Sequence, residues 1–183
     1  MLKIIAGKYR GKKLISTANN DIRPTKSLVR EALFNILLSK FDRLEGLNIA
    51  DICCGSGAFG IESISRGASF VSFIDNNKDH LKILATNLKT IEGNYNIVNY
   101  DILNLKPSNI NYDIIFLDPP YNMGQENIVF ANLVSKRWMT SKTLLVYEAS
   151  SDKKLSLEKE FTLVEERKYG KSKLFFIKLT EAI

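Results

Sequence analysis

Short apolar runs alternate with amphipathic stretches through the central part of the chain. Continuous apolar runs are typical of buried strands, whereas apolar residues spaced three and four apart indicate helices. The predicted strands are Asn48–Asp51, Phe70–Ile74, Asn96–Tyr100, Asp113–Leu117 and Leu144–Glu148. The predicted helices are Ala58–Arg66, Asn77–Glu92, Glu126–Trp138 and a first helix capped by Thr25, with Leu28, Val29, Ala32, Leu33, Ile36 and Leu37 on its apolar face. This alternation predicts a Rossmann-like α/β fold, with a mostly parallel sheet covered on both faces.

The two ends of the chain follow a different pattern. Residues Lys3–Ile15 carry short apolar runs around glycines, which predicts a small N-terminal hairpin. After a charged stretch, Phe161–Arg167 and Leu174–Leu179 predict a terminal antiparallel hairpin, which raises the expected number of main-sheet strands to seven. We therefore expect a basic hairpin extension over residues 1–22 and one α/β domain over residues 23–183.

Composition is consistent with one globular core. The chain has 183 residues, of which 45% are apolar, enough for one substantial core. It contains no apolar run long enough for a membrane span and no secretory signal at its start, so the expected location is cytoplasmic. The only cysteines, Cys53 and Cys54, are adjacent, which suits neither a metal site nor a structural disulfide. We predict no metal and two small buried residues.

Positive charge is concentrated at the N-terminal end of the chain. The first thirty residues carry a formal charge of +7, whereas the remainder carries −1. The basic residues are Lys3, Lys8, Arg10, Lys12, Lys13, Arg23, Lys26 and Arg30. Such a cluster is typical of a protein that binds a polyanion, and nucleic acid is the leading candidate, with Tyr9 as a stacking ring. A solvated lysine-rich surface is the alternative.

A glycine-rich loop follows the first strand of the predicted sheet. Gly55, Gly57 and Gly60 form a GxGxxG pattern between a strand and a helix, and Asp75 lies twenty residues after Gly55 at the end of the next strand. This context is typical of a site that binds an adenosine ribose through the acidic residue. Asp101, after the third strand, either accepts a hydrogen bond from an adenine amine or has only a turn role. Asp51 either orients the cofactor's ammonium end or braces the loop.

Asp118-Pro119-Pro120-Tyr121 follows the fourth predicted parallel strand. The prolines end the strand and stiffen the backbone, since neither can donate a ladder hydrogen bond. The Asp118 carboxylate and the Pro119 carbonyl can accept N–H protons from a planar exocyclic amine, and Tyr121 can stack on its ring. A strand-ending turn capped by Asp118 is the structural alternative. Because this chemistry suits an amine that receives a methyl group rather than hydride transfer, it favours S-adenosylmethionine over a nicotinamide dinucleotide.

Over nearly its full length, the chain resembles the RsmD-type family of 16S ribosomal RNA guanine-N2 methyltransferases. The matching blocks are Ile4–Leu14, Arg23-Pro24-Thr25, Val29–Asn35, the glycine loop through Glu62, Ser65–Ala68 and the Asp118 tetrapeptide. The resemblance implies a class I methyltransferase fold, with Asp118, Pro119, Pro120 and Tyr121 as catalytic residues that hold the guanine. Arg23-Pro24-Thr25 would close over the methionine end of the cofactor. The expected cofactor-binding residues are Arg23, Thr25, Asp51, Gly55, Ser56, Gly57, Asp75, Asn76, Asp101, Ile102 and Asp118.

The expected reaction is methyl transfer to N2 of a guanine in small-subunit ribosomal RNA. The resemblance also implies a monomeric enzyme that acts on an assembled or nearly assembled subunit. The tetrapeptide alone would equally suit adenine N6 or a protein glutamine amide, and a noncatalytic RNA-binding or ribosome-assembly protein is a further alternative. Lys171 and Lys173 are expected to bind phosphates, and Phe59 to help stack the base. His80 is expected to have a solvated or helix-packing role.

Overall fold

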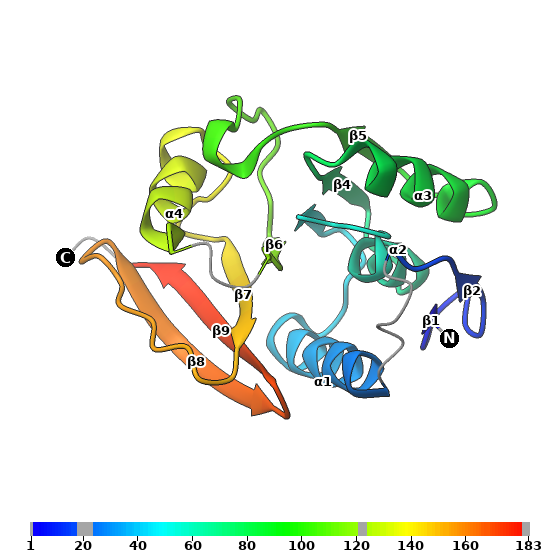
Figure 1. Cartoon of the computed structure of the whole chain (residues 1–183), viewed down its shortest axis with the longest axis horizontal. Helices are drawn as coiled ribbons and strands as arrows, with labels where there is room; N and C mark the ends of the chain where they lie inside the picture. Colours follow the sequence, from blue (N-terminus) through cyan, green and yellow to red (C-terminus); the bar gives the residue numbers. More distant parts are fainter. Residues whose placement is uncertain (1, 18–23, 121–123, 181–183) are drawn as a thin grey trace.

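A seven-stranded sheet forms the centre of the molecule (Figure 1). The computed structural model describes residues 2–17, 24–120 and 124–180, with residues 24–26 described only through their backbone. The strand order is β5-β4-β3-β6-β7-β9-β8, in which β5, β4, β3, β6 and β7 are parallel neighbours and β9 and β8 are antiparallel. The strands are β3 Asn48–Ile52, β4 Phe70–Ile74, β5 Tyr95–Val98, β6 Ile114–Leu117, β7 Leu144–Ser150, β8 Phe161–Tyr169 and β9 Ser172–Leu179.

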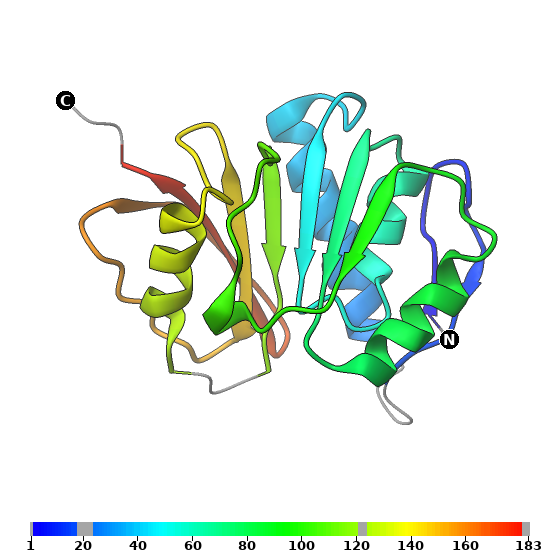
Figure 2. The same ribbon diagram turned by 90° about the horizontal axis from the view of Figure 1, so that it is seen from above.

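Helices cover both faces of this sheet (Figure 2). They are α1 Pro24–Phe41, α2 Ala58–Ser65, α3 Lys78–Leu88 and α4 Glu126–Ser135, with the short 3₁₀ helix η1 Ile102–Asn104. Along β6, Ile114 and Phe116 pack in the core with α1, α2 and α3, while Ile115 and Leu117 pack in the core with α4. This period of two buries both faces of the strand, which is why its sequence is continuously apolar. The predicted fold class is therefore confirmed.

Several predicted boundaries were wrong by a few residues. α1 begins at Pro24 rather than after a Thr25 cap, because proline at the first helical position has no N–H that needs a partner. α4 ends at Ser135 rather than Trp138, since Arg137 has a positive φ of 61°. β5 begins one residue earlier and ends two residues earlier than predicted. Leu28, expected on the buried face of α1, is 63% exposed.

The N-terminal hairpin consists of two very short strands, β1 Leu2–Lys3 and β2 Lys13–Leu14, which pair antiparallel. The hairpin packs beside α2 and α3 at one edge of the molecule (Figure 1). The buried carboxylate of Glu62 on α2 accepts hydrogen bonds from the backbone N–H groups of Ile5 and Ala6, at 2.7 and 2.9 Å. The hairpin is therefore held mainly by contacts to the domain, because two residue pairs make a weak sheet.

The C-terminal hairpin extends the main sheet beyond β7. β9 pairs antiparallel with β7 over six residue pairs, and β8 forms the outer edge. The predicted terminal hairpin is confirmed. Within the described residues, no helix combines the length and the hydrophobicity needed to cross a membrane.

Candidate active site

The glycine loop lies between β3 and α2 and has an unusual backbone. Cys53, Gly55 and Gly57 all have positive φ values, of 59°, 53° and 77°. An ideal Cβ on Gly57 would lie 2.3 Å from the end of the Leu84 side chain on α3, so a larger residue would be strained and would also displace that side chain. The loop therefore brings its backbone close to the carboxyl ends of the parallel strands, where this fold class binds ligands.

Asp75 at the end of β4 is tied to this loop. Its Oδ2 accepts a hydrogen bond from Gly55 N–H at 2.9 Å and lies 3.2 Å from His80 Nδ1, while its Oδ1 accepts from Asn77 N–H at 2.8 Å. His80 therefore has a specific partner, which the expected solvated or helix-packing role did not include. Asn77, not Asp75, caps α3. A carboxylate offers about four acceptor positions, so room for about one further hydrogen bond remains.

Asp51 braces the first turn of α2. Its Oδ2 accepts from Gly60 N–H at 2.9 Å, and the residue is 2% exposed. Burial raises the pKa of Asp51 well above its ordinary value; the Gly60 hydrogen bond opposes this rise, and the charges of Asp118 and Asp75 add to it. Asp51 also lines the cavity described next, so bracing the loop and facing a ligand are compatible.

Two cavities lie at the carboxyl ends of the strands. The larger has a volume of about 480 Å³ and is lined by the glycine loop, the start of α3, α1 and Asp118. The second, of about 440 Å³, is lined by Tyr100, Asp101, Ile102 and Leu103. Both cavities share Cys53, Asp75, Asn76 and Pro120 in their walls. The two spaces are therefore neighbours across Asp75, as a two-part ligand would require.

The side chain of Asp101 has a local structural role as well. It caps η1 by accepting from Leu103 N–H at 3.0 Å, and it accepts from Asn104 Nδ2 at 3.4 Å. Ile102, 7% exposed, forms part of the same cavity wall. The predicted turn role and the predicted ligand-facing position thus coexist.

Asp118 and Pro119 directly follow β6. Asp118 N–H donates to the carbonyl of Ile52 at 3.3 Å, which extends the pairing with β3 by one residue. Asp118, Pro119 and Pro120 line the larger cavity, so the structure brings these three residues of the tetrapeptide and the glycine loop to one space. Three predicted site residues cannot be placed: Arg23 and Tyr121 lie outside the described residues, as does the side chain of Thr25.

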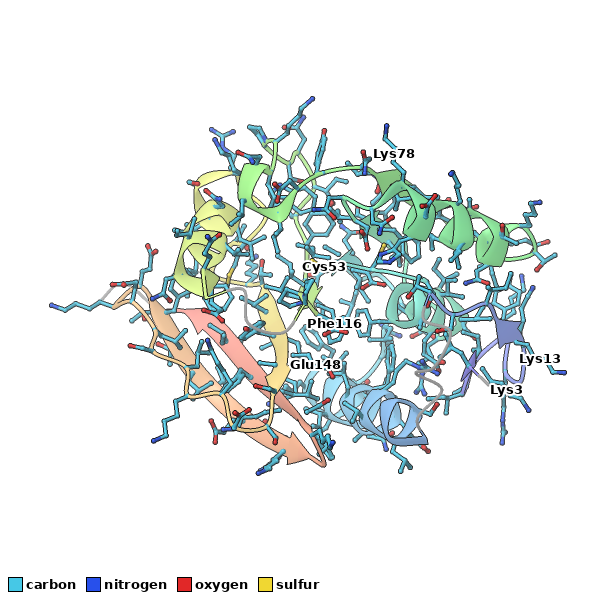
Figure 3. All side chains as sticks on the ribbon, viewed as in Figure 1. Lys3, Lys13, Cys53, Lys78, Phe116 and Glu148 are labelled. Carbon is cyan, nitrogen blue, oxygen red and sulfur yellow. The ribbon has the colours of Figure 1, made fainter. Side chains whose placement is uncertain are left out.

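Sequence reasoning missed part of the cavity wall. Glu148 on β7, 9% exposed, and Phe116 on β6 both line it, and Figure 3 shows them close to Cys53 at the middle of the molecule. Ser16 and Thr17, which follow the hairpin, line it too. Glu148 could have been found because it ends the predicted strand Leu144–Glu148, although β7 itself extends to Ser150. The N-terminal residues had no comparable signal, since only the docking of the hairpin brings them there.

Some predicted contact residues have other roles in the structure. Phe59 is 4% exposed and stacks between Phe34 and Phe116, with ring centroids 5.1 and 4.4 Å away, so it is a wall of the cavity rather than an open stacking face. The hydroxyl of Tyr9 accepts from Glu92 N–H and anchors the hairpin. Lys173 donates to the carbonyl of Lys153 and is 15% exposed.

The larger cavity is acidic. Among the described residues that line it, Asp51, Asp75, Asp118 and Glu148 carry carboxyl groups, whereas Arg30 carries the guanidinium. Burial, together with the charges of Asp75 and Asp118, raises the pKa of the Cys53 thiol to about 12. The thiol is therefore protonated at neutral pH. An environment that disfavours negative charge in this way suits a cationic ligand.

The comparisons with known proteins agree with this picture. A family model described as "Conserved hypothetical protein 95" matches residues 2–178. The chain belongs to this family. This membership confirms the RsmD-type resemblance, because proteins named Ribosomal RNA small subunit methyltransferase D are among the relatives.

Three relatives define the similarity. The protein of that name from Haemophilus influenzae is 31% identical, over 92% of this chain and 89% of its own. An uncharacterized methylase of Rickettsia prowazekii is 31% identical, over 97% of this chain and 98% of its own. The structure of a candidate methyltransferase from Escherichia coli has a TM-score of 0.81 at 28% identity and covers 97% of both chains. The class I methyltransferase fold is thus shared over almost the whole length.

Proposed function

We propose that the protein is an S-adenosylmethionine-dependent methyltransferase that modifies the exocyclic N2 of a guanine in small-subunit ribosomal RNA. The observation that carries the proposal is the meeting of the glycine loop, Asp75 and Asp118 around one acidic cavity. The names of the relatives support ribosomal RNA as the substrate class. Work on ribosomal RNA would also place the protein in the cytoplasm.

The charge of the cavity favours this cofactor over a dinucleotide. S-adenosylmethionine carries a sulfonium and an ammonium group against one carboxylate, whereas a nicotinamide dinucleotide carries a pyrophosphate. A pyrophosphate would need free N–H groups at the start of α2. The carboxylate of Asp51 already accepts the N–H of Gly60 there. The combined space of the two cavities suits a ligand of this size.

Most of the predicted binding residues that the structure describes line these two cavities, whereas Gly57 lines neither of them. Asp75 has an acceptor position for a ribose hydroxyl, and Asp101 and Ile102 line the cavity that would take the adenine. Gly55, Ser56 and Asn76 supply the loop walls between them. When bound, the cofactor supplies an electrophilic methyl group. Arg23 and Thr25 remain predictions for its methionine end.

The acceptor side is formed by Asp118 and Pro119. The carboxylate and the carbonyl accept N–H groups of the target amine, which aligns its nitrogen and favours the pyramidal form that can attack. The nitrogen gains a methyl group and loses one proton, and the Asp118 carboxylate both stabilises the positive charge that develops and can accept that proton. Orientation provides most of the acceleration, because the methyl donor is already reactive.

RNA binding is assigned to the basic hairpin. Lys3, Arg10 and Lys13 are exposed on it, and Figure 3 shows Lys3 and Lys13 at its surface. Such side chains bind phosphates without reading sequence. We further propose an assembled or nearly assembled small subunit as the substrate and a monomeric enzyme.

Product analysis tests the proposal. The protein is incubated with labelled S-adenosylmethionine and small ribosomal subunits, free ribosomal RNA or DNA, and the methylated nucleoside is identified after digestion. N2-methylguanosine from ribosomal RNA is expected, whereas N6-methyladenosine or no incorporation would refute it. Asp118→Ala should keep cofactor binding but lose about 10²–10³-fold in turnover.

A further inference from the structure

A second carboxylate lies beside Asp118 in the sheet. β6 and β7 are parallel neighbours in which Phe116 is paired with Val146 and Leu117 with Tyr147. Extending this register by one residue, just beyond the end of β6 at Leu117, places Asp118 beside Glu148. Residues in register on neighbouring strands point to the same face and lie about 5 Å apart at Cα. Both residues line the larger cavity, so two carboxylates face one ligand space from adjacent positions on neighbouring chain segments.

The position of Glu148 is fixed by its surroundings. Glu148 belongs to a strand that is buried along almost its whole length and paired on both sides, with its own register partner Leu174 on β9. Glu148 is only 9% exposed. Phe116, which lies two residues before Asp118 on the same face of the sheet, is similarly buried at 7%. A side chain on such a rigid element is held more accurately than one on a loop.

The two carboxylates match one edge of guanine. On this edge the N2 amine and the N1–H are neighbouring donors, and an ionised carboxylate is a pure acceptor. Adenine differs, because its N6 amine is next to an N1 that accepts. We propose that Glu148 accepts the N1–H of the target guanine while Asp118 and Pro119 hold the N2 amine. Glu148 then determines guanine specificity, and this inference rests on the proposed function.

The contact between Glu148 and N1–H would also exclude purines whose N1 is unprotonated. A purine with an unprotonated N1 would place a lone pair against the Glu148 carboxylate and would offer it no N–H to accept. A site that hydrogen-bonds a substrate N–H discriminates strongly against analogues that lack it. A carboxylate has two oxygens with several acceptor positions, so Glu148 can receive this N–H in addition to a protein partner. We expect about a 10- to 100-fold preference for guanine from this contact.

The test replaces the target guanine by 2-aminopurine in the ribosomal RNA substrate. 2-Aminopurine keeps the N2 amine but has an acceptor at N1. Wild-type protein should methylate guanine about 10- to 100-fold more efficiently, as kcat/KM. In Glu148→Gln the amide can donate to N1, so this ratio should fall at least about tenfold.

The matched control is Glu126→Gln. Glu126 is also 9% exposed but interacts with Tyr147 and Lys153 and lines neither cavity, so its variant should leave the ratio unchanged. Equal use of both bases by wild-type protein would overturn the inference even if E148Q did not fold. An unchanged ratio in E148Q, with N2-methylguanosine still formed, would overturn it and leave the proposed function intact. A product other than N2-methylguanosine from the guanine-containing substrate would overturn both.

Discussion

Removing the carboxylate of Glu62 should detach the N-terminal hairpin. Glu62 is fully buried, accepts the N–H groups of Ile5 and Ala6 and pairs with Arg66 at 2.8 Å, with Arg30 Nε at 3.9 Å. Glu62→Ala would leave these donors and cations uncompensated, which should lower the free energy of unfolding by about 3–5 kcal/mol. Glu62→Gln should cost about 1.5–3 kcal/mol, because the amide oxygen retains only part of the hydrogen bonding.

Urea denaturation and limited proteolysis measure this effect, with Glu92→Gln as the control. Glu92 also pairs with the hairpin, through Lys8 at 2.7 Å, but its side chain is 85% exposed. An exposed pair is screened by water, so E92Q should leave the urea midpoint within error. E62A should lower the midpoint or expose the hairpin to protease. If E62A behaved like E92Q in both measurements, the buried carboxylate would not be the anchor.

Three further predictions concern pH, backbone and charge. Burial raises the pKa of Asp51, so its protonated form stabilises the fold at low pH and this contribution is lost as the pH rises through the folded-state value. In Asp51→Asn the amide oxygen can still accept the N–H of Gly60. The urea midpoint of the cofactor-free variant, measured relative to that of wild type, should therefore increase as the pH rises from about 4. A difference in midpoint that does not depend on pH would contradict this. Gly7→Ala would place a Cβ 1.8 Å from the carbonyl oxygen of Ser65, whereas Gly11→Ala, at a similar φ, meets nothing within 4 Å. Thermal unfolding should therefore show a larger loss for G7A, and equal losses would disprove the close contact. Each of Lys3→Ala and Lys13→Ala should reduce the salt slope of RNA binding by about 0.7–0.9, if its ammonium neutralises one phosphate. An unchanged slope in a salt titration would remove that lysine from the interface.

The order of strands and helices was predictable because local patterns determined it. Ile114–Leu117 is apolar at every position since both faces are buried, and the glycine loop is recognisable because its positive φ values at Gly55 and Gly57 favour glycine. The fold class and the strand-end positions of Asp75 and Asp118 follow from these signals. The end of α4 did not follow, because the positive φ at Arg137 has no marker in the sequence.

Contacts between segments that are far apart in the sequence were harder to predict. The pairing of His80 with Asp75 depends on how α3 leaves the loop after β4, and the neighbourhood of Glu148 and Asp118 depends on strand register. Neither relation has a periodic pattern along the chain. The exposure of Leu28 was equally hard to predict, since helical spacing identifies the apolar face of a helix but not where that face stops being covered by the rest of the protein.

The hairpin and the glycine loop share one side chain that joins them mechanically. Asn87 on α3 is 6% exposed; its Oδ1 accepts from Ile15 N–H at 2.8 Å, and its Nδ2 donates to the carbonyls of Ile15 and Ser56 at 3.0 and 2.9 Å. An ideal Cβ on Gly55 would lie 3.7 Å from Thr17 Oγ1, so the chain leaving the hairpin passes directly over the loop. Displacing the hairpin therefore breaks contacts to the cavity wall. The basic hairpin and the ligand cavity are therefore linked through Asn87, and loss of its buried hydrogen bonds would destabilise both regions.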